Sequence, residues 1–233
     1  MADMGLGYGS EFQLLRFLGR HRNEFDSIVK KAINTDAPIE WLDFKYDRES
    51  LTLDSELKGI EFLSEYEKFK DIKKEWTEYW TGNTQNWDAV FKCNGSYYIV
   101  EAKAHLKELE SNFSGSENNN KKKIEKAFIQ TANELEVSSI DTWFGRYYQL
   151  ANRLAFIAFL NRQKIDAKLV YIYFINGYKK RVIVNGKTNE IEDKGVKTEK
   201  EWNVEIEKEY KELKIDKEKI KKHITNIFIT CER

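Results

Sequence analysis

The sequence is poor in several residue types, and each shortage excludes a class of protein. Its 233 residues include a single proline, which argues against a proline-rich linker between two domains. Cys93 and Cys231 are too few for a disulfide framework, so we expect reduced thiols and a cytoplasmic protein. The three histidines and two cysteines lack the spacing of zinc ligands. No apolar run approaches the ~20 residues of a membrane span, so we expect no membrane partner.

The charge of the chain is balanced, with 39 basic and 39 acidic residues. A net charge of zero neither supports nor excludes a nucleic-acid partner, because local basic patches decide that question. Hydrophobic residues make up 41% of the chain, which is enough for a substantial core. We therefore expect one folded domain over residues 1–233.

Hydrophobic patterns predict alternating helices and strands along the chain. Ser10 is expected to cap the first helix, and residues 167–175 form a continuous apolar run typical of a central strand. Helices are expected at 10–20, 22–33, within 55–80, at 123–135, 141–163 and 199–213, strands at 39–47, 167–175, 180–186 and 224–230, and a polar loop at 111–123. This pattern predicts an α/β fold with a mixed sheet flanked by helices.

Residues 87–103 carry the strongest local signal, because Asn94-Gly95 separates two β-forming runs. With these two residues in a type I′ turn, Ala89 faces Val100. Asp88 and Glu101 then face each other, with Cβ atoms ~4.5–5.5 Å apart. The two-residue period places Lys103 on the same face as Glu101.

Three ionisable groups on one face of one hairpin can perform phosphodiester hydrolysis. Asp88 and Glu101 could share Mg²⁺ or Mn²⁺, whose remaining ligands would be water and substrate phosphate. The Lys103 ammonium could act on the attacking water or neutralise charge in the transition state. The alternative is an ordinary surface hairpin with solvated side chains.

The segment 87–103 resembles the core motif of the PD-(D/E)xK nuclease superfamily, in which one strand carries an aspartate and the next carries (D/E)-x-K. The order of the expected elements over residues 9–175 is also similar to the family core. The resemblance implies a restriction-endonuclease-like fold, with a helical insertion at about 50–85 and a C-terminal extension at about 176–233 outside that core. Trp87 departs from the pattern, since it stands where the family name has proline.

The resemblance also implies an acidic metal ligand on the first helix, for which Glu11 is the candidate. Glu11 shares a helical face with Leu14, Leu15 and Leu18, although a first-turn acid also suits the helix dipole.

Further polar residues are candidates for substrate binding. Gln149 and Arg153, one turn apart, either face the hairpin or form a partly exposed polar stripe. His105 continues the Glu101–Lys103 face if the strand extends that far, and is otherwise solvated.

Two other groups have an ordinary and a functional interpretation. The lysines at 121–123 could meet a nucleic-acid backbone or belong to a solvated loop. Trp76, Tyr79, Trp80 and Trp87 could stack on unpaired bases or pack in the core.

The sequence thus predicts a Mg²⁺-dependent nuclease that acts on DNA. The first alternative is a catalytically inactive module of the same fold that binds nucleic acid or protein. A structural or immunity-type partner protein is a further alternative, favoured only by the charged insertion. Each of these three functions is compatible with a homodimer.

Overall fold

The computed structural model describes residues 9–42, 56–82, 84–115, 118–184, 187–193 and 195–231. Its helices in these ranges are α1 (Ser10–Gly19), α2 (Arg22–Ala32), η2 (Glu61–Leu63), α3 (Phe69–Tyr79), η3 (Leu106–Leu109), α4 (Asn118–Glu134), α5 (Tyr148–Arg162), α6 (Glu199–Glu212) and α7 (Lys217–Ile220). Its strands are β1 (Glu40–Trp41), β2 (Leu57–Lys58), β3 (Asn86–Trp87), β4 (Ala89–Cys93), β5 (Ser96–Lys103), β6 (Ala167–Ile175), β7 (Lys179–Val184), β8 (Lys187–Asp193) and β9 (Ile224–Thr230). None of the described helices is long and apolar enough to cross a membrane.

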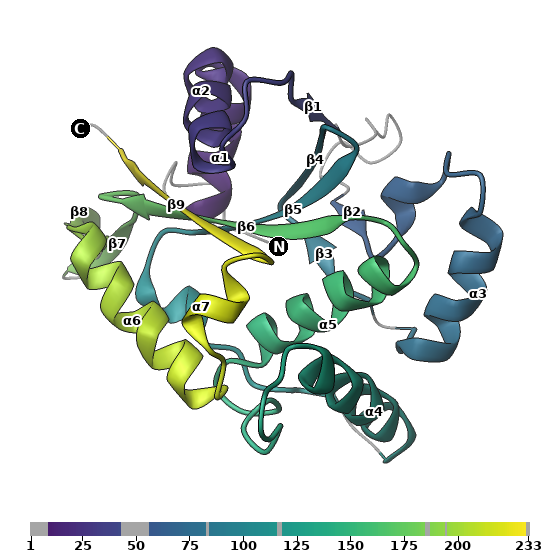
Figure 1. Cartoon of the computed structure of the whole chain (residues 1–233). Coiled ribbons are helices and arrows are strands. Elements are labelled where there is room, and N and C mark those ends of the chain that lie inside the picture. Colours follow the sequence, from purple (N-terminus) through teal and green to yellow (C-terminus); the bar gives the residue numbers. More distant parts are fainter. Residues whose placement is uncertain are drawn as a thin grey trace.

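A five-stranded mixed sheet runs through the middle of the molecule in the order β1-β4-β5-β6-β9 (Figure 1). β1, β4 and β5 are antiparallel neighbours, whereas β5, β6 and β9 run parallel. β6 has a parallel partner on each side, and Lys168 is its only residue that is not buried. This position explains the continuous apolar sequence of the strand. The predicted mixed α/β sheet flanked by helices is confirmed.

Helices cover both faces of this sheet (Figure 1). On one face α1 and α2 pack with an apolar core that includes Phe25 and Phe91. On the other face α4, α5 and α6 enclose a larger core that includes Phe156 and Tyr171. Every residue of α5 from 150 to 160 is buried, as its nearly all-apolar sequence predicts.

The described part of the insertion before the hairpin contains η2 and α3, which lie at the side of α5 (Figure 1). Trp76 of α3 packs edge-on against Phe156 of α5, with ring centroids 5.2 Å apart. Trp80 and Trp87 are 2% and 0% exposed. The tryptophans of this cluster are therefore core residues, and the interpretation as base-stacking side chains is wrong for them.

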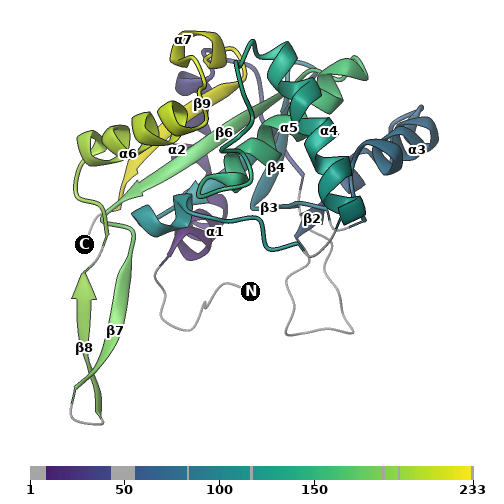
Figure 2. The same cartoon turned by 90° about the horizontal axis from the view of Figure 1, so that it is seen from below.

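The C-terminal segment belongs to the same fold rather than to an appendage. β9 forms the edge of the central sheet beside β6. Trp202 of α6 is fully buried and packs against Tyr173 of β6, with ring centroids 4.9 Å apart. The expected strand at 180–186 is the first half of a hairpin, β7–β8, that extends away from the body (Figure 2).

Several local predictions differ from the structure. α4 begins at Asn118, so residues 118–122 are helical instead of part of a polar loop. α5 begins only at Tyr148, and the turn before it is tied to the residue after α6 by a 3.0 Å bond from Trp143 Nε1 to Leu213 O. Ser10 does not cap α1; it is the first helical residue, and its hydroxyl donates to Glu108 Oε1 at 3.2 Å. Residues 43–47 of the expected first strand lie outside the described residues.

Candidate active site

The β4–β5 hairpin has the register that its sequence predicts. Asn94 and Gly95 form the turn with φ values of 50° and 79°, in the left-handed region that a type I′ turn requires. The pairing continues along both strands and ends with Ala89 opposite Val100. The predicted hairpin and its register are confirmed.

Asp88 and Glu101 lie on the same face of the sheet. Asp88 directly precedes β4 and lies near the charged side chains of that face, since Glu101 acts to raise its pKa and Lys103 and Arg153 act to lower it. Ile99, two residues before Glu101, packs in the core beneath α5. Asp88 Oδ2 accepts a 2.7 Å hydrogen bond from the backbone N–H of Ala102, which holds the carboxylate against β5.

Glu101 is a buried carboxylate shared by two cations. Its Oε1 accepts a 2.6 Å bond from Lys103 Nζ, and its Oε2 accepts a 2.9 Å bond from Arg153 Nε. Glu101 and Lys103 are 4% exposed, and Arg153 is 7% exposed. Three charged groups at this depth are tolerated because each has an oppositely charged partner.

α5 supplies the second layer of the site. Gln149 and Arg153 lie one turn apart on it, and Lys103 Nζ donates to Gln149 Oε1 at 2.7 Å. Of the two arrangements left open by the sequence, the structure contains the one in which both side chains face the hairpin. Lys103 is therefore fixed between a carboxylate and an amide.

Arg153 is held by more than its ion pair. Its Nη1 donates to Asn152 Oδ1 at 2.9 Å, and its Nη2 donates to the backbone carbonyl of Asn86 at 3.1 Å. The guanidinium also lies 4.8 Å from the ring centre of Trp87. These contacts link α5 to β3, the segment that leads into Asp88.

The two carboxylates of the hairpin have opposite electrostatic surroundings. Burial, followed by the negative charge of Glu101, raises the pKa of Asp88 to about 7. Burial also acts to raise the pKa of Glu101, but the cations Arg153 and Lys103 outweigh it and hold this pKa below its ordinary value. Glu101 is thus the permanent anion, and Asp88 resists ionisation when no further positive charge is present.

α6 adds a carboxylate that the sequence analysis missed. Glu209 is 2% exposed. Burial raises its pKa to about 8, Lys103 acts to lower it, and Glu101 acts to raise it. The sequence did indicate that Glu209 is buried, since it lies at helical spacing with Trp202, Ile206 and Leu213, which are buried.

Glu11 lies in the first turn of α1 and is partly buried. The apolar stripe that suggested its role is only partly present, because Leu14 is buried but Leu15 is 37% exposed. Among the described residues no three His, Cys, Asp or Glu side chains form a group suited to a metal ion. Glu11 is therefore not joined to Asp88 and Glu101 as a third acidic ligand in this structure.

His105 does not continue the face of Glu101 and Lys103, because β5 ends at Lys103. Its Nε2 lies 3.4 Å from Glu108 Oε1, and its ring packs against Tyr178 with centroids 4.3 Å apart. The backbone turns into η3 directly after His105, with the side chain of Glu108 accepting from the N–H of Ala104 at 2.5 Å. This local turn directs the imidazole away from the expected position.

The donor atoms of the site suit Mg²⁺ in kind. Asp88 and Glu101 present hard carboxylate oxygens on one face, and one or two carboxylates plus water commonly hold this ion. Asp88 Oδ1 makes no hydrogen bond within the described part of the chain. Both oxygens of Glu101 already accept a bond, one from Lys103 and one from Arg153. Glu101 could therefore bind a metal ion only through an oxygen that it shares with one of these cations.

Comparisons of the chain with protein-family models, with curated proteins and with solved structures found no match.

Proposed function

We propose that this protein is a metal-dependent nuclease that hydrolyses phosphodiester bonds, with DNA as its expected substrate. The observation that carries the proposal is the end of the hairpin, where Asp88 accepts a hydrogen bond from the backbone of Ala102 and Glu101 is bonded to Lys103. The paired register of β4 and β5 stops one residue before, at Ala89 opposite Val100. The order of helix, strand, hairpin, crossover helix α5 and buried strand β6 supports a restriction-endonuclease-like fold.

Each residue has a separable role in this proposal. Asp88 and Glu101 would hold Mg²⁺ or Mn²⁺, which when bound lowers the pKa of a water ligand and polarises the scissile phosphate. Lys103 presents its ammonium to the attacking water or to the charge that develops on the phosphate. Gln149 orients that ammonium through the 2.7 Å bond to its side-chain oxygen. Arg153 keeps Glu101 ionised and in place.

A catalytically inactive module of the same fold is the second candidate. One observation favours it: both oxygens of Glu101 are already engaged, by Lys103 and by Arg153. A carboxylate neutralised by two protein cations has less attraction for a third positive charge. In this candidate the charged cluster holds α5 against the hairpin and binds no metal.

Cleavage assays separate the two candidates. Labelled single- and double-stranded DNA and RNA would be incubated with the full chain and Mg²⁺ or Mn²⁺, with EDTA as the blank. The nuclease proposal expects metal-dependent cleavage that falls by about 10²–10³ in Lys103→Ala, the loss typical of one preorganised electrostatic donor. Lys107→Ala is the matched control, because Lys107 is exposed on η3 and should leave the rate unchanged.

Calorimetric titration with the metal alone adds a readout independent of cleavage. The nuclease should bind Mg²⁺ or Mn²⁺, and Lys103→Ala should retain most of that binding because the lysine is not a ligand. Absence of both metal binding and cleavage, with nucleic-acid binding retained, would favour the inactive module and reject the nuclease.

A further inference from the structure

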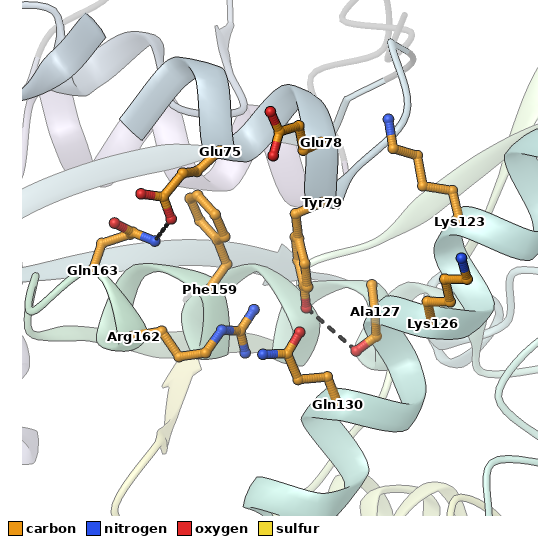
Figure 3. A pocket seen from close by; sticks show the side chains of 10 residues that line it. All are labelled: Glu75, Glu78, Tyr79, Lys123, Lys126, Ala127, Gln130, Phe159, Arg162 and Gln163. Atoms are coloured by element: carbon orange, nitrogen blue, oxygen red, sulfur yellow. Dashed lines mark hydrogen bonds between the residues drawn. The ribbon is translucent and has the colours of Figure 1, made fainter. Parts of the chain in front are cut away.

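A cavity of about 340 Å³ lies among α3, α4 and α5 (Figure 3). Its volume falls within the ~300–1,000 Å³ of small-molecule sites. Tyr79 and Phe159 form its aromatic part, with ring centroids 5.1 Å apart and planes inclined by 25°. No residue of the candidate active site lines it, so it is a separate site.

Three cations line this cavity. Lys123 and Lys126 extend from α4 on one side, and Arg162 comes from α5 (Figure 3). The two lysines form no ion pair within the described part of the chain. Arg162 donates to Glu134 at 2.8 Å, and its guanidinium lies 4.6 Å from the ring centre of Tyr79. Lys123 Nζ donates one hydrogen bond to the backbone carbonyl of Thr77, which leaves its other N–H groups. The Lys126 ammonium and these remaining N–H groups of Lys123 can serve an anionic ligand.

Hydrogen-bonding groups of another kind lie across the cavity from the lysines. Gln163 Nε2 donates to Glu75 Oε2 at 2.5 Å, and the Gln130 amide points toward Arg162 (Figure 3). Amides offer both donors and acceptors, and a carboxylate accepts from N–H groups. Glu78 adds a second carboxylate to the lining. The cavity is thus positively charged on one side, and its other side is suited to a ligand whose edge carries N–H groups.

We propose that this cavity binds a mononucleotide unit. Its phosphate would pair with the ammonium groups of Lys123 and Lys126. Its planar base would stack on the guanidinium of Arg162, which lies over the partly exposed ring of Tyr79. The edge of the base would meet Gln163 and Glu75. Free nucleotides and nucleotides within a strand share this chemistry.

A second cavity extends the basic surface toward the candidate active site. It has a volume of about 290 Å³, adjoins the first through the shared lining residue Lys123, and includes Lys58 and Lys73. Its lining residue Thr84 precedes Asp88 by four positions, a span of at most about 14 Å. A nucleic-acid strand bound in both cavities would therefore approach Asp88. This route rests on the proposed function, whereas mononucleotide binding does not.

The test is calorimetric titration of the full chain in EDTA, which prevents metal-dependent cleavage. The probes are nucleoside monophosphates, inorganic phosphate and a short single-stranded oligonucleotide. Lys126→Gln should weaken binding about tenfold, which corresponds to about 1.4 kcal/mol. Lys122→Gln is the matched control, because Lys122 is exposed on the same helix and does not line the cavity.

The outcomes distinguish the sources of the ligand. If mononucleotides bind and Lys126→Gln weakens that binding, the ligand is a free nucleotide. If only the oligonucleotide binds and Lys126→Gln weakens that binding, the ligand is a nucleic-acid strand. No binding of any probe at millimolar concentration, or equal binding by Lys126→Gln and the wild type, overturns the proposal. Loss of binding in Lys103→Ala but not in Lys126→Gln would place the ligand in the candidate active site, which rejects the cavity and leaves the nuclease proposal intact.

Discussion

The two faces of the central sheet use the same strands but bury different chemistry. Successive residues of β5 show the contrast: Val100 and Ala102 enter the apolar core beneath α1 and α2, whereas Glu101 and Lys103 point to the side of α5. All four are buried. The difference teaches that burial alone does not define a core residue, because the α5 side buries a charged cluster next to its larger apolar core.

The energetic roles of the two faces should differ accordingly. Burial of apolar side chains stabilises a fold by about 1.5–3 kcal/mol for each large residue. A buried ion pair contributes little net stability, because desolvation of the charges offsets their attraction. The apolar side chains of both faces therefore account for folding, and we interpret the charged cluster on the α5 side as the part maintained for chemistry.

The largest expected effect is on the apolar face. Phe91 is fully buried and stacks on Tyr98 with ring centroids 4.6 Å apart. Phe91→Ala should lower the free energy of unfolding by about 3–5 kcal/mol, measured by urea denaturation. Any nuclease activity per folded molecule should persist, because the ring points away from Glu101. A loss below about 1 kcal/mol would mean that the apolar core beneath α1 and α2 contributes little to stability.

A smaller effect is expected when the ion pair is broken. Arg153→Met leaves one oxygen of Glu101 without its cation and should cost about 1–3 kcal/mol in urea denaturation. Adding Glu101→Gln removes the stranded charge, so the double variant should be no less stable than Arg153→Met alone. Additive losses would show that the charged face stabilises the fold, and the contrast between the faces would fail.

The pH dependence of stability tests the buried carboxylate of α6. The pKa of Glu209 is about 8 in the folded protein, raised by burial from an ordinary value of 4.5. The folded state therefore keeps a proton that the unfolded chain releases, and this contribution to stability is lost as pH rises from about 4.5 through 8. Glu209→Gln should melt progressively higher than the wild type over that interval, with a constant difference above it. Melting curves with equal pH slopes for both proteins would contradict the prediction.

The smallest expected effect concerns Asp88 without metal. Its folded pKa of about 7 means that stability present below its ordinary pKa of 3.8 is lost as pH rises through 7. Asp88→Asn removes the charge and can still accept from Ala102, so it should raise the melting temperature at pH 8 in EDTA by a few degrees. About 2–4 °C corresponds to 1 kcal/mol for a chain of this size.

Millimolar metal provides the control for Asp88. The wild type should gain stability from Mg²⁺ or Mn²⁺ by mass action, and Asp88→Asn should not. If the variant melts lower in EDTA and responds fully to metal, Asp88 is a structural residue and the proposed metal site loses a ligand.

The sequence predicted those parts of the molecule that depend on local geometry. The turn at Asn94-Gly95 sets the hairpin register within a few residues, so the pairing up to Ala89 opposite Val100 followed from spacing alone. The apolar run 167–175 likewise identified β6 as a central strand. The position of His105 was not predictable by extending the strand, because the turn into η3 competes with strand continuation there.

The surroundings of the hairpin were decided only by tertiary structure. Spacing placed Gln149 and Arg153 on one stripe of a helix, but the packing of α5 against β5 brought that stripe to Lys103 and Glu101. Glu209 lies 106 positions after Lys103 and joins the site because β9 extends the sheet and α6 crosses beneath it. Local sequence determines which side chains share a face, since the periods of strand and helix are fixed. Which faces meet depends on the burial of the whole apolar surface, and no single segment encodes it.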